Sequence, residues 1–135
     1  MATGLVIEDS DSVRCILVDI LHEADVVAEE AQGPGRAIDL CKDGHFDVIF
    51  LDWDLPCHGA LDFLKDIARL ELAKRPPIIL CAATHNPDEL ALAKAIGANF
   101  HLLKPYDPAS VRAALHKSGV MNAVMDEVTV RTSAG

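Results

Sequence analysis

The sequence has 135 residues, half of them apolar and 24% charged, which is the composition of a single globular domain. Its net charge of −9 argues against a nucleic-acid-binding surface, which would need clustered lysine and arginine side chains. The N-terminus lacks the basic start of a signal peptide, and no apolar run approaches the roughly 20 residues that span a bilayer, so we expect a cytoplasmic protein without membrane insertion.

Short apolar runs alternate along the chain with stretches of helical periodicity. The expected strands, in chain order, are residues 5–7, 25–31, 48–51, 76–83 and 100–103. The expected helices follow them: one behind the possible caps Ser10 and Asp11, then 36–42, 61–68, 86–97 and one from residue 107. The last two begin with Asn-Pro and Asp-Pro, in which a capping side chain precedes a proline at the first helical position.

Five strand–helix units in strict alternation predict an α/β fold, in which helices cover both faces of a parallel sheet. Helical periodicity is lost from about residue 118. We therefore expect one domain over residues 1–119 and a flexible C-terminal tail over residues 120–135.

The four cysteines are Cys15, Cys41, Cys57 and Cys81, and none of them forms a C-x-x-C pair. This spacing does not favour a zinc site, in which ligands come in close pairs. We expect reduced thiols, two or three of them packed as small hydrophobic side chains.

Acidic side chains follow the first and third expected strands, and a lysine follows the fifth. Glu8 and Asp9 come after the first strand, Asp52 ends the third with Asp54 just beyond, and Lys104 follows the fifth. The carboxyl ends of parallel strands share one edge of a doubly wound sheet, so these side chains should converge. A divalent cation would offset the repulsion between carboxylates, and Mg²⁺ prefers carboxylate, water and phosphate oxygens. The residues therefore predict a Mg²⁺-assisted phosphoryl site with a carboxylate nucleophile.

Three motifs, LVIEDS, FDVIFLDWDLP and HLLKPYD, resemble the response-regulator receiver domain of two-component signalling in their order and spacing. The resemblance covers roughly residues 3–117, nearly the whole chain. It implies a flavodoxin-like fold with strand order 2-1-3-4-5. It also implies a signalling domain rather than an enzyme, with only its own phosphorylation and dephosphorylation chemistry.

The resemblance assigns roles to individual residues. It implies that Asp52 is the phosphoryl acceptor and that Lys104 contacts the phosphoryl group. Glu8, Asp9 and Asp52 would hold Mg²⁺, with a further metal ligand from the backbone carbonyl of Asp54.

The resemblance also bears on two backbone features. It implies a cis peptide bond before Pro105, a conformation essentially confined to X–Pro bonds. The loop after Asp52 departs from the family pattern because it is one residue short, so that Gly59 comes early.

Three positions bear on how phosphorylation would be reported. Ala82 stands where the family has a Ser or Thr that bonds the phosphoryl group, and His101 stands at the position of an aromatic switch residue. Thr84 lies two residues beyond Ala82, where it could replace the missing hydroxyl or simply lie in the loop. His101 could be a pH-sensitive switch or a partly exposed strand histidine.

The leading interpretation is a single-domain response regulator, phosphorylated by a histidine kinase or a phosphotransfer protein with Mg²⁺. Its output would be protein–protein contact or onward phosphotransfer. The downstream target would dock on the face of the fourth helix, fifth strand and fifth helix.

Two alternatives remain at this point. One is a pseudo-receiver, a binding module with weak or absent phosphorylation switching, which Ala82 and His101 favour. The other is an aspartate-nucleophile phosphatase, since an Asp after an apolar strand and a second Asp two later also fit that pattern. That family needs a further acidic pair on a strand after its lysine, which this sequence lacks.

Overall fold

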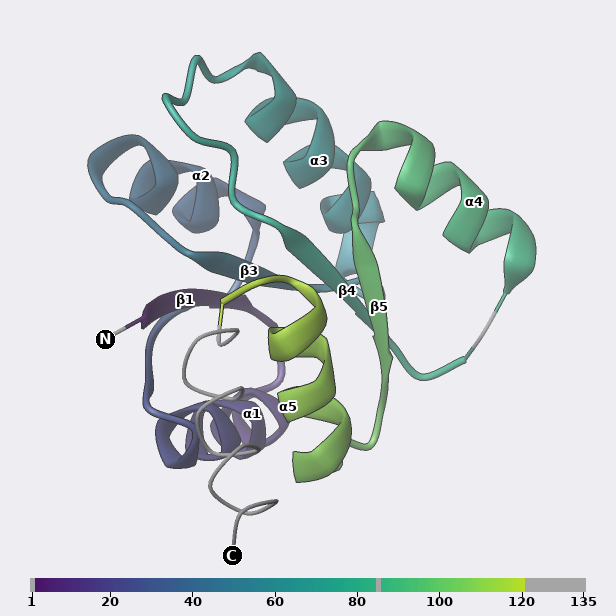
Figure 1. The fold of residues 1–135 in the computed structure, drawn as a ribbon. Coiled ribbons are helices and arrows are strands. Elements are labelled where there is room, and N and C mark those ends of the chain that lie inside the picture. Colours follow the sequence, from purple (N-terminus) through teal and green to yellow (C-terminus); the bar gives the residue numbers. More distant parts are fainter. Residues whose placement is uncertain (1, 85, 121–135) are drawn as a thin grey trace, which may run out of the picture.

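The computed structural model describes residues 2–84 and 86–120 (Figure 1), so most of the expected tail lies outside the described residues. Five parallel strands form one sheet in the order β2-β1-β3-β4-β5. The strands are β1 (Ala2–Ile7), β2 (Val26–Ala31), β3 (Val48–Asp52), β4 (Ile78–Ala82) and β5 (Phe100–Leu103). The helices are α1 (Asp11–Glu23), α2 (Pro34–Asp43), α3 (Gly59–Arg69), α4 (Pro87–Ile96) and α5 (Pro108–Lys117), with a short 3₁₀ turn η1 (Pro56–His58) before α3. The expected α/β fold and strand order are confirmed.

Helices cover both faces of the sheet, with α1 and α5 on one side and α2, α3 and α4 on the other (Figure 1). The two hydrophobic cores take alternate residues of each strand. In β3, Val48 and Phe50 pack in the core under α1 and α5, whereas Ile49 and Leu51 pack in the opposite core. All four are at most 1% exposed. A strand covered on both faces is apolar at every position, which explains the continuous run before Asp52.

Three helices begin at the caps that the sequence indicates. Ser10 Oγ accepts a hydrogen bond from the Val13 N–H at the start of α1. The Asn86 side chain accepts from the N–H groups of Asp88 and Glu89, and Asp107 does the same for Ser110. A cap of this kind contributes about 1 kcal/mol by satisfying backbone donors that have no partner within the helix.

The sheet order brings the ends of β1, β3 and β5 to one edge. In the register, Ile7 of β1 pairs with Leu51 of β3, so the next residues, Glu8 and Asp52, lie side by side. Leu103 of β5 pairs with the last residue of β4, so that Lys104 projects from the same edge. This edge lies where the chain order reverses around β1 and β3, which is the usual ligand-binding position in such sheets.

Two strands begin later than the sequence indicates. β4 begins at Ile78 rather than at residue 76 because the two prolines before it have no N–H to give to the sheet. β2 begins at Val26 because Asp25 has a φ of 61°, a left-handed conformation that interrupts an extended strand.

The cysteines behave as the sequence suggests. All four are free thiols; Cys41 and Cys81 are buried, and Cys15 and Cys57 are exposed. Burial raises the pKa of Cys41 to about 11 and that of Cys81 to about 12, which keeps both thiols protonated near neutral pH. No helix in the described part of the chain has the length and apolar character needed to cross a bilayer.

Candidate functional site

Three carboxylates meet at the carboxyl edge of the sheet. Glu8 and Asp9 follow β1, Asp52 ends β3, and one oxygen from each lies within 4.8 Å of the others. Glu8 is 3% exposed and Asp52 is 2% exposed, whereas Asp9 is open to solvent. Three hard oxygen donors with one open side, on which waters can complete the coordination, fit the ligand preference of Mg²⁺. The cluster could therefore hold a divalent cation.

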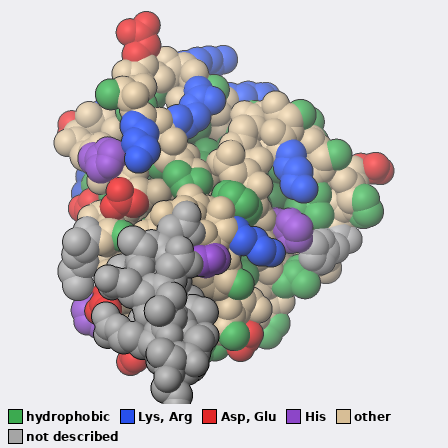
Figure 2. Space-filling model, viewed as in Figure 1, with side chains coloured by type: hydrophobic (Ala, Val, Ile, Leu, Met, Phe, Trp, Pro, Cys, Tyr) green, Lys and Arg blue, Asp and Glu red, His purple; other side chains and the backbone are tan. Residues whose placement is uncertain are grey.

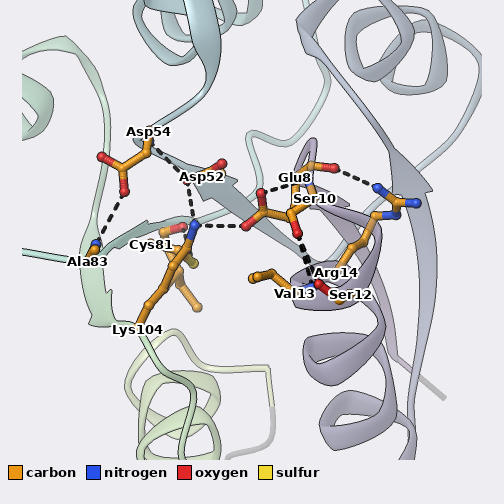
Figure 3. Close-up of polar contacts among 11 residues, drawn as sticks. Glu8, Ser10, Ser12, Val13, Arg14, Asp52, Asp54, Cys81, Ala83 and Lys104 are labelled. Carbon is orange, nitrogen blue, oxygen red and sulfur yellow. Dashed lines mark hydrogen bonds and ion pairs between the residues drawn. The ribbon is translucent and has the colours of Figure 1, made fainter.

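Lys104 reaches this cluster from the end of β5. Its Nζ lies 2.8 Å from Glu8 Oε1 and 2.8 Å from Asp52 Oδ1 (Figure 3). Its backbone is held as well, because its N–H donates to the carbonyl of Ala82 at 2.9 Å. The peptide bond from Lys104 to Pro105 is cis, as the resemblance implied. One ammonium thus partly neutralises two buried carboxylates, which would otherwise be costly to keep charged.

The burial of the cluster shows in its acid–base properties. Burial, reinforced by the neighbouring Asp52 carboxylate, raises the pKa of Glu8 to about 6 in spite of the favourable bond from Lys104. For Lys104, burial acts to lower the pKa, but hydrogen bonds to Asp52 and Glu8 outweigh it and raise the pKa above its ordinary value. Lys104 therefore stays charged at neutral pH, and Glu8 is the group that is poised to take up a proton.

Asp54 lies in the turn after Asp52, and its side chain makes a contact that the sequence did not indicate. Its backbone N–H donates to Asp52 Oδ1 at 2.9 Å, which holds the Asp52 carboxylate in place. Its Oδ2 accepts from the N–H of Ala83 at 3.3 Å, so the side chain joins the end of β3 to the end of β4 (Figure 3). The metal-ligand role of the Asp54 carbonyl stays a prediction.

Arg14 is a residue that the sequence analysis missed. It lies in the second turn of α1, and its side chain is only 10% exposed. Its Nη1 donates to the backbone carbonyl of Glu8 at 2.8 Å. A signal was present: Arg14 precedes Leu17 and Leu21 by three and seven positions, so it lies on the same, buried face of the helix.

The three positions expected to report phosphorylation lie in three different settings. Ala82 ends β4 and is buried, at 7% exposed, with no hydroxyl to offer the site. Thr84 lies beyond the strand in an exposed bend. His101 lies on β5 with its side chain exposed. Their roles in switching stay predictions.

The short loop after Asp52 contains two residues in the left-handed backbone conformation. Cys57 and His58 both have positive φ, 57° and 56°, in the 3₁₀ turn that leads into α3. Left-handed conformations cost about 1–2 kcal/mol for residues other than glycine. Gly59 follows at a close approach, because a Cβ there would lie 3.2 Å from Leu55 Cβ.

Trp53, the residue after Asp52, connects the end of β3 to α4. Its N–H donates to the carbonyl of Cys81 at 2.8 Å, and its indole Nε1 donates to Glu89 Oε2, in the first turn of α4, at 3.3 Å. It is the only tryptophan in the sequence and it follows Asp52 directly. Its fluorescence therefore reports on the immediate surroundings of the site.

Comparison with known proteins places this geometry in a family. The family described as the response regulator receiver domain matches residues 5–116. The chemotaxis protein CheY-3 of Vibrio cholerae is 27% identical over 114 residues, covering 84% of this chain and 88% of that protein. CheY of Halobacterium salinarum is 25% identical over 125 residues, covering 93% and 95%.

Solved structures agree. The chemotaxis protein CheY4 of Vibrio cholerae superposes with a TM-score of 0.82 at 28% identity, covering 87% of this chain and 98% of that one. The carboxylate cluster, the lysine and the sheet order therefore occur in the setting that the sequence resemblance implied. The chain belongs to the response regulator receiver domain family of two-component signalling.

Proposed function

We propose that this protein is a phosphorylatable signalling switch, in which Asp52 accepts a phosphoryl group from a histidine kinase or a phosphotransfer protein in the presence of Mg²⁺. The observation that carries the proposal is the placement of the Asp52 carboxylate within 4.8 Å of the oxygens of Glu8 and Asp9 and 2.8 Å from Lys104 Nζ. A nucleophilic carboxylate, metal-binding acids and a fixed cation are together what phosphoryl transfer needs.

The chain's own groups account for most of the reaction. An Asp52 carboxylate oxygen forms a bond to phosphorus as the P–N bond of phosphohistidine breaks, and the departing imidazole nitrogen keeps the electron pair and takes a proton. The N–H of Asp54 orients the carboxylate, and Lys104 faces the negative charge that arrives with the phosphoryl group. Bound Mg²⁺, held by Glu8, Asp9 and Asp52, would neutralise phosphoryl charge.

Acetyl phosphate with Mg²⁺ provides a direct test, because it donates a phosphoryl group without a kinase. Intact-mass measurement should show the gain of one acid-labile phosphoryl group. Asp52→Asn should abolish the gain, and Asp62→Asn, an exposed aspartate on α3, should retain it. Equal labelling of the Asp52→Asn variant would refute the assignment of the acceptor.

The output is proposed to be protein–protein contact by a cytoplasmic receiver, through the face formed by α4, β5 and α5. This face contains a cavity of about 410 Å³ whose lining includes Lys94, His101 and Lys117 around Phe100 and Leu103. Figure 2 shows Lys, Arg and His side chains among hydrophobic ones on the side of the molecule that carries these elements. Apolar surface rimmed by polar groups is typical of a docking site.

A second candidate is the pseudo-receiver, because Ala82 cannot give the phosphoryl group a hydrogen bond. Phosphorylation and partner binding distinguish the two candidates. A receiver takes up a phosphoryl group and then changes conformation. A pseudo-receiver binds its partner equally well when Asp52 is replaced in Asp52→Asn. The phosphatase candidate predicts multiple turnovers of a generic phosphate ester, and a single stoichiometric phosphorylation would rule it out.

A further inference from the structure

Beside the acidic cluster lies a buried cation that contacts none of the three carboxylates. The guanidinium of Arg14 donates from Nη1 to the carbonyl of Glu8, from Nε to Glu30 Oε1 at 2.8 Å, and from Nη2 to Asp11 Oδ1. Asp11 and Glu30 are 80% and 48% exposed, so water could replace either of these bonds. The bond to the Glu8 carbonyl is buried and has no such substitute.

This bond controls the backbone that carries the metal-binding pair. The N–H of Glu8 is held by the carbonyl of Ala31 on β2 at 3.0 Å, and its C=O is held by Arg14. The peptide unit is planar, so a fixed Glu8 carbonyl also fixes the orientation of the Asp9 N–H and the start of the Asp9 residue. Figure 3 shows Glu8 held on two sides, by Lys104 at its carboxylate and by Arg14 at its carbonyl.

Asp9 needs this support more than its neighbours do. Among the described residues, Lys104 fixes the carboxylates of Glu8 and Asp52, but no hydrogen bond or ion pair holds the carboxylate of Asp9, which is exposed. Its position relative to the other two oxygens therefore depends on its backbone. A rotation of the Glu8–Asp9 peptide unit would move the Asp9 carboxylate out of the cluster.

We propose that Arg14 is a positioning residue for the metal site, which holds the Glu8–Asp9 peptide so that both carboxylates face Asp52. The proposal rests on the proposed function, in that the cluster binds Mg²⁺. Arginine suits the task because its planar fork can serve three acceptors in fixed directions, whereas lysine offers a single point charge. Partners that orient metal ligands typically change metal affinity by 10–100-fold when they are removed.

The test is a Mg²⁺ titration followed by Trp53 fluorescence, in the wild-type protein and in Arg14→Met and Arg14→Lys. Met keeps the apolar length of the side chain without its donors. We expect the Mg²⁺ Kd of Arg14→Met to be at least about 10-fold higher than that of the wild type. The Kd of Arg14→Lys should lie between these two values. In the metal-free protein, amide hydrogen exchange at Glu8, whose N–H donates to the carbonyl of Ala31, should be faster in both variants, a readout that requires no metal.

Two controls separate positioning from general stability. Leu17→Ala removes a buried side chain three positions further along α1, so it should lower the melting temperature while leaving the Mg²⁺ Kd within about two-fold. Glu30→Gln weakens an exposed partner of Arg14 and keeps the bond to the Glu8 carbonyl, so it should also leave the Kd nearly unchanged.

The outcomes distinguish the two proposals. If the wild-type protein binds Mg²⁺ and Arg14→Met binds it equally well, the inference about Arg14 is wrong and the proposed function stands. If the affinities of Arg14→Met and Leu17→Ala fall in proportion to their melting temperatures, Arg14 is only structural. If the wild-type protein shows no response to millimolar Mg²⁺, the metal site itself is refuted and the inference with it. Should Arg14→Met not fold, Arg14→Lys gives the same comparison.

Discussion

Lys104 Nζ lies 2.8 Å from Glu8 Oε1, although 96 positions separate the two residues in the sequence. The contact links the end of β5 to the end of β1, across the ends of β3 and β4, which lie between them in the sheet. The same ammonium lies 2.8 Å from Asp52, so a single side chain supplies the positive charge for two buried acids. In the metal-free protein Lys104 thus neutralises the two carboxylates by itself, whereas a bound divalent cation would share this task.

Removing this ammonium should destabilise the metal-free protein. Lys104→Met leaves Glu8 and Asp52 buried without their partner, and breaking a buried ion pair in this way costs about 3 kcal/mol or more. Urea unfolding without metal measures the loss. Saturating Mg²⁺ should restore more stability to Lys104→Met than it adds to the wild type, because the metal takes over the neutralisation of both carboxylates.

The matched control is Lys65→Met on the exposed face of α3, which should change the unfolding free energy little. If the Lys104 and Lys65 variants lose the same stability, the carboxylates do not depend on Lys104.

Glu8 should give the metal-free protein a distinctive pH dependence. Its pKa is raised from 4.5 to about 6 by burial, so the folded protein takes up a proton here more readily than the unfolded chain. The contribution of Glu8 to stability is therefore most favourable below pH 4.5 and is lost as the pH rises to 6. The difference corresponds to at most about 2 kcal/mol.

Chemical unfolding of the wild type and Glu8→Gln across pH 4–7, without metal, isolates this effect. The stability of the wild type relative to Glu8→Gln should fall between pH 4.5 and 6 and then level off. Parallel pH profiles for the two proteins would show that Glu8 has an ordinary pKa.

Phosphorylation should shift the conformation only weakly, because Ala82 cannot bond the phosphoryl group. A hydrogen bond to a charged group is worth roughly 1.5–3 kcal/mol, which is about a ten- to hundred-fold change in population. Ala82→Thr should therefore enlarge the response. Amide chemical shifts of residues 82–106, with and without the phosphoryl mimic beryllofluoride, measure it in both proteins.

Thr84→Ala is the companion variant, since Thr84 could supply the missing hydroxyl. It should leave the response unchanged. A wide response in the natural protein that disappears in Thr84→Ala would assign the switch to Thr84 and overturn the argument from Ala82.

The left-handed turn after Asp52 should be a site of stored strain. Cys57 has a φ of 57°, where glycine loses nothing, so Cys57→Gly should relieve about 1–2 kcal/mol of strain. The greater entropy of glycine in the unfolded chain offsets part of this, which leaves a net gain of about 0.5–1 kcal/mol. Thermal unfolding measures the gain, and Cys15→Gly, on the exposed side of α1, should instead lose roughly 0.3 kcal/mol, the difference between the helix propensities of cysteine and glycine. A loss in Cys57→Gly would show that the turn is not strained.

Local patterns in the sequence determined the elements of this fold. Alternating apolar runs and helical stretches predicted all five units, and Asn86 and Asp107 predicted where their helices begin, because capping is a contact between near neighbours in the chain. The sequence also placed Glu8, Asp52 and Lys104 at the ends of their strands, because a strand end is visible in the local pattern of apolar residues. Their convergence followed from the rule that parallel strands end at a common edge.

Only the tertiary structure decided which groups hold that edge together. The bond from Arg14 to the Glu8 carbonyl and the bond from Asp54 to Ala83 depend on the direction of each side chain once the helices have packed. The positive φ of Cys57 depends on how a short loop spans from β3 to α3. These features depend on three-dimensional distances that packing sets between separate elements, and the spacing of residues along the chain does not specify such distances.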